Sequence, residues 1–380
     1  MRGKFDVSSD QPDPTRRLLL RSGGALCALT CMKASSETKR FEWKRIDPES
    51  AGFARELPEQ LDQGVASGAL TNLHAVIIVR HGNLVVERYY KGQDESWGQP
   101  FREVTFNADT LHDIRSITKS IVSLLYGIAL SEGKVPGVET PIANVFTAYP
   151  ELVKDERKRH IKIVHALTMT MGLEWNEDLP IDDPRNSQMA LEASQDRYRY
   201  LLTQRAVANP GEKWQYCGGA TEILGHLIAR GTGMPILEYA RKKLFLPLGI
   251  ENVVWNKGDH DEEAAAWGLR MRPLDLARIG QLVLQRGEWN GARIVPANWL
   301  TESMIPRVDG WPDLRYGYQW HLFPTPSGSL AYWGLGLGGQ RLVISPERES
   351  VSVIHMGNYY RADQVELSFA VRKLINAATR

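Results

Sequence analysis

Ser116 and Lys119 are the first residues whose types and spacing suggest chemistry, because a serine and a lysine three positions apart share one side of a helix. Apolar residues at 117, 121, 124, 125 and 128 predict such a helix over 116–131, with a buried face that begins beside Ser116. The helix N-terminus favours negative charge at the hydroxyl. Burial should lower the pKa of the lysine, so that it can accept the hydroxyl proton. The pair predicts a nucleophilic serine with an adjacent base, and a helix cap with a surface lysine is the simpler alternative.

A tyrosine marks a second candidate segment. In 210–219 a Pro-Gly turn leads to Tyr216, and small residues follow it before a helix that should begin near 220. A phenol beside an ammonium group can relay protons, because the cation favours the ionised phenol. Taken alone, a tyrosine that only packs this loop remains the commoner interpretation.

Glycines dominate a third segment, 333–340, which ends at Gly339 and Gln340 and enters a predicted strand. Glycines on a strand allow another backbone or a ligand to come close, and they leave N–H groups that can stabilise an oxyanion. The run superficially resembles a dinucleotide-binding loop. A strand-like stretch, RLVIS, follows it where that loop needs a helix, so this interpretation is rejected.

The elements that must hold these residues differ along the chain. Runs 73–79 and 84–90 are β-rich and predict a hairpin, and 316–323, 341–345 and 350–355 also predict strands. Helical periodicity covers 188–204, 220–230, 236–244, 273–285 and 363–378. Strands near both ends predict an α+β fold with one antiparallel sheet built from distant segments and flanked by helices. The sheet region is expected over about 40–110 and 315–380, and an inserted helical region over about 116–310.

Composition excludes several classes of protein. The 380 residues contain 46 basic and 45 acidic side chains, a net charge of +1, which argues against a nucleic-acid partner. No apolar run is long enough for a membrane-spanning helix, so stable membrane insertion is not expected. The nine histidines include no H-E-x-x-H run and no ligand-like pair, so we expect neither a metal site nor a cofactor. Oligomeric state is not readable from the sequence.

The first 35 residues resemble a leader peptide. A polar, basic stretch with Arg16 and Arg17 precedes a short apolar run over 22–32, and a small polar exit follows. This order, with the twin arginines, predicts a cleavable export signal over 1–35, and the remaining residues, 36–380, are expected to form the folded domain. We therefore expect a periplasmic or secreted protein, and a cytoplasmic one if the leader does not function.

Together these segments resemble the serine β-lactamase and penicillin-binding superfamily, whose S-x-x-K motif carries the nucleophile. The similarity is strongest to the class C-like branch and its hydrolases of the 6-aminohexanoate-dimer type. It covers roughly residues 45–378, and the matching blocks stand in the family's order: 111–120, 166–175, 210–217, 268–280 and 338–347.

The resemblance implies a β-lactamase/transpeptidase-like fold and a two-step reaction without metal. Ser116 would be acylated, Lys119 would deprotonate it, and Tyr216 would help to protonate the leaving group. The backbone amides of Ser116 and of Gln340, or its neighbour Gly339, would form the oxyanion hole.

Two departures from the family pattern bear on the substrate. Gly218 stands where the tyrosine loop often has asparagine, and Leu337 stands at the apparent position of the K-T-G lysine, which helps to bind substrate carboxylates. Arg341 is a partial substitute for that cation. We therefore expect a serine esterase or amidase that acts on small-molecule esters or linear amides. A β-lactamase or D,D-peptidase is the first alternative, and a non-catalytic ligand sensor is the second.

Overall fold

The structure, a computed structural model, describes residues 41–97, 99–258 and 261–380. The predicted export signal over 1–35 lies outside the described residues. No helix in the described segments is both long and apolar enough to cross a membrane.

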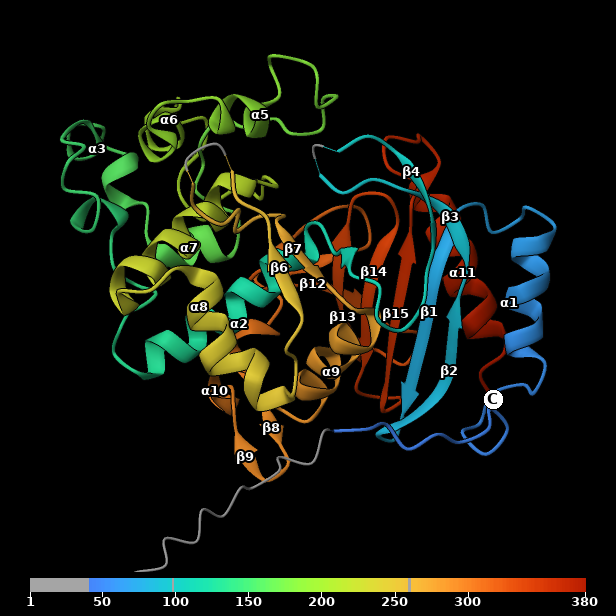
Figure 1. The fold of residues 1–380 in the computed structure, drawn as a ribbon. Helices are drawn as coiled ribbons and strands as arrows, with labels where there is room; N and C mark the ends of the chain where they lie inside the picture. The colour runs from blue at the N-terminus through green and yellow to red at the C-terminus, as the bar shows by residue number, and fades with distance from the viewer. Residues whose placement is uncertain (1–40, 98, 259–260) are drawn as a thin grey trace, which may run out of the picture. The chain divides into compact units, whose positions relative to one another are not determined.

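One large antiparallel sheet organises the described chain and confirms the predicted α+β fold (Figure 1). In the described residues it has eight strands in the order β10-β11-β12-β13-β14-β15-β1-β2. Their bounds are β10 Val308–Asp309, β11 Arg315–Tyr316, β12 His321–Pro324, β13 Leu330–Gly336, β14 Gln340–Ser345, β15 Ser350–Met356, β1 Leu73–Arg80 and β2 Asn83–Tyr89. Strand β1 pairs with β15, so strands from the two ends of the chain lie side by side in one sheet, as the sequence predicted.

Helices cover both faces of this sheet, which explains why β1 and β14 are buried along almost their whole length. In Figure 1, α1 and α11 lie on one face, and α9 and α2 on the other. The helices are α1 Leu57–Ala66, α2 Ile117–Ser131, α3 Glu151–Lys154, α4 Ile163–Leu167, α5 Ser187–Glu192, α6 Arg197–Thr203, α7 Gly218–Thr232, α8 Ile236–Ala240, α9 Pro273–Leu284, α10 Ala297–Ser303 and α11 Gln364–Ala377.

The helical region is less purely helical than predicted. It contains a small sheet in which β5 (His112–Asp113) and β6 (Val253–Trp255) flank β7 (Leu269–Met271). Two further pairs are β3 (Lys91–Asp94) with β4 (Arg102–Thr105), and β8 (Glu288–Trp289) with β9 (Ala292–Arg293). Such strands of two to four residues are too short to show a periodic pattern in the sequence.

Two predicted elements are broken by polar contacts. The helix predicted over 188–204 divides into α5 and α6, because the Asp196 side chain caps α6 by accepting the Arg199 N–H at 2.9 Å. The strand predicted over 316–323 is interrupted at Gln319, which has a left-handed φ of 64°. Its buried side chain donates to the Ala166 carbonyl and accepts from Thr221, which draws this residue out of the sheet.

Helix α2 is enclosed on all sides. Gly127 lies where the indole of Trp299 from α10 crosses it, and the Trp299 Nε1 donates to the Ser123 carbonyl at 2.9 Å. A Cβ at Gly127 would lie 2.2 Å from the indole Cδ1, so only glycine permits this close approach. The main hydrophobic core continues from this helix to β1 and α7, and includes Ile77 and Leu224.

Candidate active site

A sharp turn presents Ser116 at the start of α2. The preceding residue, Arg115, has a φ of 50°, a conformation that costs free energy for a non-glycine residue and must be held by its surroundings. The buried Arg115 guanidinium lies 3.3 Å from Asp113 and 3.2 Å from Glu95, and it also stacks over Trp97. Arg115 therefore fixes the turn that positions Ser116.

Ser116 and Lys119 are in direct contact, as their spacing predicted. Lys119 Nζ donates to Ser116 Oγ at 3.0 Å and to the Ala266 carbonyl at 2.9 Å, and the lysine is only 4% exposed. The interpretation of Lys119 as a surface residue is therefore wrong. The Ser116 N–H has no backbone or side-chain acceptor within the described part of the chain, which leaves it available to a ligand.

The carbonyl that holds Lys119 belongs to a segment fixed from α7. Both carboxylate oxygens of Glu222 accept backbone N–H groups, from Ala265 at 3.1 Å and from Ala266 at 2.8 Å. Arg197 of α6 lies 3.5 Å from the same carboxylate. Burial raises the pKa of Glu222 to about 7, although Arg197 acts in the opposite direction.

The pKa of Lys119 shifts in the direction opposite to the sequence prediction. Burial alone would lower it, but the electrostatic interactions with Tyr216 and Glu177 outweigh burial and leave the pKa raised. The sequence argument considered burial and omitted these partners, one of which it had not identified. The amine is thus held in its charged form by the groups around it.

Tyr216 lies beside this amine. Its ring centroid is 4.9 Å from Lys119 Nζ, and a hydrogen bond from the amine to the Tyr216 side chain contributes to the raised pKa of the lysine. The structure therefore brings together the hydroxyl, the amine and the phenol that the sequence singled out. Their chemical roles remain a prediction.

Aromatic rings surround Tyr216. Trp311 packs against its ring at 4.9 Å, and His321 stacks on Trp311 at 4.9 Å. Burial, together with the charges of Lys119 and Arg341, lowers the pKa of His321 to about 3, so this ring is neutral at physiological pH. The sequence analysis missed His321, since a lone histidine in a strand-like run carries no signal of a site.

Glu177 is an acidic residue at the site that the sequence analysis also missed. Its Oε2 accepts from Trp175 Nε1 at 2.8 Å and from the Gly218 N–H at 2.8 Å. Burial raises its pKa, although Lys119 acts in the opposite direction. A Cβ at Gly218 would lie 2.2 Å from Gln188 Oε1 and 3.2 Å from Glu177 Oε2. These two side chains thus fill the space that the family's asparagine would need.

The glycine-rich segment meets Ser116 at residues 334–337. A Cβ at Gly336 would lie 2.5 Å from the Ile114 carbonyl, and one at Gly334 would lie 2.9 Å from Ile117. β12 pairs with β13 only as far as Trp333, so one side of this strand is open beyond that point. Leu337 N–H has no acceptor within residues 41–97, 99–258 and 261–380.

Gly339 and Gln340 lie farther round the hairpin. A Cβ at Gly339 would meet Met356, and the buried Gln340 side chain donates to the carbonyls of Leu337 and Met356. No contact in the described residues links either of them to Ser116. Their part in an oxyanion hole remains a prediction, and these contacts favour Leu337 instead.

Arg341 lies on the face of the sheet opposite the glycines that pack against α2, although its charge still acts on His321. It pairs across the strands with Leu335, which shares a face with Trp333 under α11, whereas Gly334 and Gly336 face α2. Arg341 donates to the Gln340 carbonyl at 2.8 Å. It is therefore a poor substitute for the K-T-G lysine.

One buried group in the described chain has the donors to hold a metal ion: His74, Asp94 and His112. His112 Nδ1 lies 2.9 Å from the Asp113 carbonyl and His74 Nε2 lies 3.2 Å from Asn72 Oδ1, so both of these nitrogens donate. The other two ring nitrogens lie 2.9 Å apart and face each other, and need a shared proton or a cation between them. The sequence could not reveal this pair, because its members are 38 residues apart.

Comparisons with known proteins show the family of the chain. The sequence model of the family described as beta-lactamase matches residues 53–374. The chain belongs to the beta-lactamase family. A solved member of the same fold, EstCE1, described as a hydrolase with promiscuous acyltransferase activity, superposes with a TM-score of 0.69 at 15% identity, covering 86% of this chain and 99% of that one.

Two curated relatives share more of the sequence. The 6-aminohexanoate-dimer hydrolase of Paenarthrobacter ureafaciens is 25% identical over 308 residues, which are 73% of this chain and 70% of that protein. Esterase EstB of Burkholderia gladioli is 26% identical over 216 residues, 54% of this chain and 52% of the esterase. Both relatives are named as hydrolases.

Proposed function

We propose that this protein is a serine hydrolase that cleaves esters or linear amides of small molecules through an acyl-enzyme on Ser116. The observation that carries the proposal is the 3.0 Å contact between Lys119 Nζ and Ser116 Oγ, at the start of a buried helix and beside Tyr216. A nucleophile and its proton acceptor within hydrogen-bond range are the geometric requirement for this chemistry. Its beta-lactamase-family relatives, named as a dimer hydrolase and an esterase, support the same class.

In the first step Ser116 Oγ attacks the substrate carbonyl, and its proton passes through Lys119 to the Tyr216 oxygen. The amine gives up one of its own protons as it takes this one, so it is charged before and after the step. The Lys119–Tyr216 pair then protonates the leaving alkoxide or amine, and the acyl group stays on Ser116. A water molecule attacks the ester carbonyl, gives its proton to the pair and releases the acid, after which Ser116 regains its proton. We assign the oxyanion donors to the N–H groups of Ser116 and Leu337, because both lack acceptors in the described residues.

The described residues of the site lack the cation that would bind the carboxylate of a β-lactam. This absence favours an ester or amide substrate. β-Lactams and D-Ala-D-Ala peptides carry a carboxylate, and the glycine-rich segment 333–340 contains no lysine or arginine that could bind it. Arg341 faces the opposite side of the sheet. A substrate without a carboxylate next to the scissile bond would lose nothing from this arrangement.

The test combines a covalent serine probe with a substrate panel. The wild type should take up one fluorophosphonate label per chain and hydrolyse a short p-nitrophenyl ester, and the Ser116→Ala variant should do neither. Ser120→Ala, one position beyond Lys119 on the same helix, is the matched control and should still label. Efficient hydrolysis of a cephalosporin without activity on esters or linear amides would contradict the proposed substrate class. An unlabelled but folded wild type would support the ligand sensor instead.

A further inference from the structure

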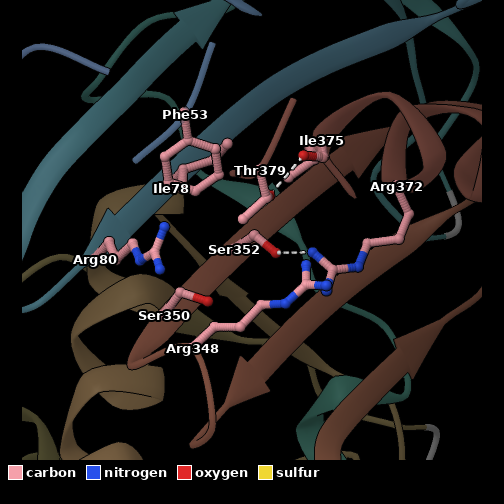
Figure 2. A pocket seen from close by; sticks show the side chains of 9 residues that line it. All are labelled: Phe53, Ile78, Arg80, Arg348, Ser350, Ser352, Arg372, Ile375 and Thr379. Atoms are coloured by element: carbon pink, nitrogen blue, oxygen red, sulfur yellow. Dashed lines mark hydrogen bonds between the residues drawn. The ribbon is translucent and has the colours of Figure 1, made fainter. Parts of the chain in front are cut away.

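A second polar cavity lies on the α11 side of the large sheet, on the face opposite α2. It is lined by three arginines, Arg80, Arg348 and Arg372, and by the hydroxyl groups of Ser350, Ser352 and Thr379 (Figure 2). The cavity is small, with a volume of about 10 Å³, and it opens to solvent on one side. No carboxylate lines it.

Register and packing explain why the three arginines line one cavity. Arg80 ends β1 and pairs across the strands with Ser350 of β15, so both side chains leave the sheet on one face. Arg348 lies in the turn that precedes Ser350, and Arg372 approaches from α11. Figure 2 shows the guanidinium groups of Arg348 and Arg372 directed toward Ser352. Three separate elements therefore supply the positive charge.

The arginines have few partners of their own. Arg80 donates to the Ala51 carbonyl at 2.9 Å, Arg348 to Asn376 Oδ1 at 3.1 Å and Arg372 to Ser352 Oγ at 3.4 Å. In the described chain none of the three forms an ion pair with a carboxylate. The Nε atoms of Arg80 and Arg372 are buried without any hydrogen-bond partner. Burial and then the charge of Arg348 lower the pKa of Arg372 to about 10.

Converging like charges without a counter-ion are unfavourable, and the buried N–H groups add a further cost. An anion with several oxygens would relieve both. Guanidinium groups bind phosphate through paired hydrogen bonds, and serine and threonine hydroxyls can donate to the remaining oxygens. A carboxylate would offer two oxygens and one negative charge to three cations. A phosphate dianion offers more oxygens and two negative charges.

We infer that Arg80, Arg348 and Arg372 form a binding site for a phosphate group, separate from the site at Ser116. The ligand is inorganic phosphate or the phosphate of a small monoester. Because the cavity lies on the face opposite α2, the inference does not depend on the proposed hydrolase activity.

Calorimetric titration of the full chain with inorganic phosphate, at constant ionic strength, tests the inference. Saturable binding of one phosphate per chain is expected. Arg348→Gln and Arg372→Gln should each weaken it roughly 10- to 100-fold, because each removes a charged hydrogen-bond donor. Lys373→Gln removes the same charge from the exposed side of α11 and should bind as the wild type does. Ester hydrolysis should be unchanged in all three variants.

Further arms separate the outcomes. Glycerol phosphate that binds as well as inorganic phosphate identifies a monoester site, and binding of inorganic phosphate alone identifies a site for the free ion. Arg372→Lys, which keeps the charge and loses the planar fork, should fall between wild type and Arg372→Gln. If Arg372 variants do not fold, Arg348→Gln, in a partly exposed turn, still decides. The inference would be overturned if phosphate binding did not saturate, if chloride bound equally well, or if Lys373→Gln weakened phosphate binding as much as the arginine variants do.

Discussion

At the scale of single residues, the site depends on the contact between Lys119 and Ser116. Lys119→Ala removes the amine that contacts the serine hydroxyl and carries its proton toward Tyr216, and general acid–base groups typically contribute a factor of about 10²–10⁴. We therefore expect kcat/KM for a p-nitrophenyl ester to fall by about that factor. The exposed Lys154, which has no role in the site, provides a control variant, Lys154→Ala, that should keep full activity. Undiminished hydrolysis by Lys119→Ala would remove the lysine from the mechanism.

His321 gives a prediction for the pH dependence of stability. Its folded-state pKa is lowered to about 3 from an ordinary value of 6.5, by burial and by Lys119 and Arg341. Between these two values the unfolded chain binds a proton that the folded chain excludes, so His321 destabilises the fold as pH falls through this window. His321→Phe keeps a ring beside Trp311 and cannot be protonated. Its free energy of unfolding should decline less than that of the wild type between about pH 6.5 and pH 3, as measured by urea denaturation. Parallel curves would contradict the assignment.

Residue types and spacing identified Ser116, Lys119 and Tyr216, because the chemistry of the first two is visible within one helical turn. Arg115, Glu177, Glu222 and His321 were not found. Each is a common residue type in a segment without a distinctive pattern. Arg115 adjoins Ser116, but its ion pairs come from tertiary packing, and the other three reach the site only through such packing. The direction of the Lys119 pKa shift was mistaken because it depends on Tyr216 and Glu177, which the fold brings to the amine.

At the scale of elements, the tight crossing of α10 over α2 predicts the effect of one methyl group. Gly127→Ala should improve the intrinsic helix propensity of α2, yet the new Cβ would overlap the rigid indole of Trp299. We expect a net loss of about 1–3 kcal/mol in the free energy of unfolding. Gly137→Ala is the control, because a Cβ there meets open space and should change stability by less than about 0.5 kcal/mol. Unfolding in denaturant measures both, and an unchanged Gly127→Ala would show that the two helices can separate without cost.

Elements with a long, regular pattern were predicted well. The hairpin of β1 and β2 and the helices α2, α7 and α9 match their predicted ranges closely, because the apolar periodicity of each reports its own burial. The breaks at Asp196 and Gln319 were missed, since they come from a helix cap and from hydrogen bonds to remote helices. The strands of the small β5-β7-β6 sheet were missed because each is only two or three residues long.

At the scale of the whole molecule, a single core joins the sheet and the helical region. Ile77 of β1, Leu224 of α7 and Ile344 of β14 belong to one continuous cluster. We therefore expect residues 41–380 to unfold in one cooperative transition. Far-ultraviolet circular dichroism, which follows mainly the helices, and tryptophan fluorescence should give the same midpoint in urea. Two separated midpoints would show instead that the sheet and helical regions, which the sequence distinguished, unfold independently.

The order of segments explains why the overall architecture was predictable. Strands near both ends of the chain can pair only if the region between them folds back. The antiparallel pairing of β1 with β15 is the result. The convergence of Arg80, Arg348 and Arg372 follows from the same closure. It could not be foreseen, because no pattern in the sequence shows which face of the sheet each arginine takes.

The Arg197–Glu222 contact means that the position of the Lys119 amine depends on a residue that touches neither Ser116 nor Lys119. Genome surveys that select sequences by the serine, lysine and tyrosine alone would count homologues whose arginine had drifted to another residue. In such chains the buried Glu222 would lose a counter-ion, and its hold on the loop bearing Ala266, which positions the amine, would weaken. Lineages of this kind could retain every signature residue and still have lost their chemistry.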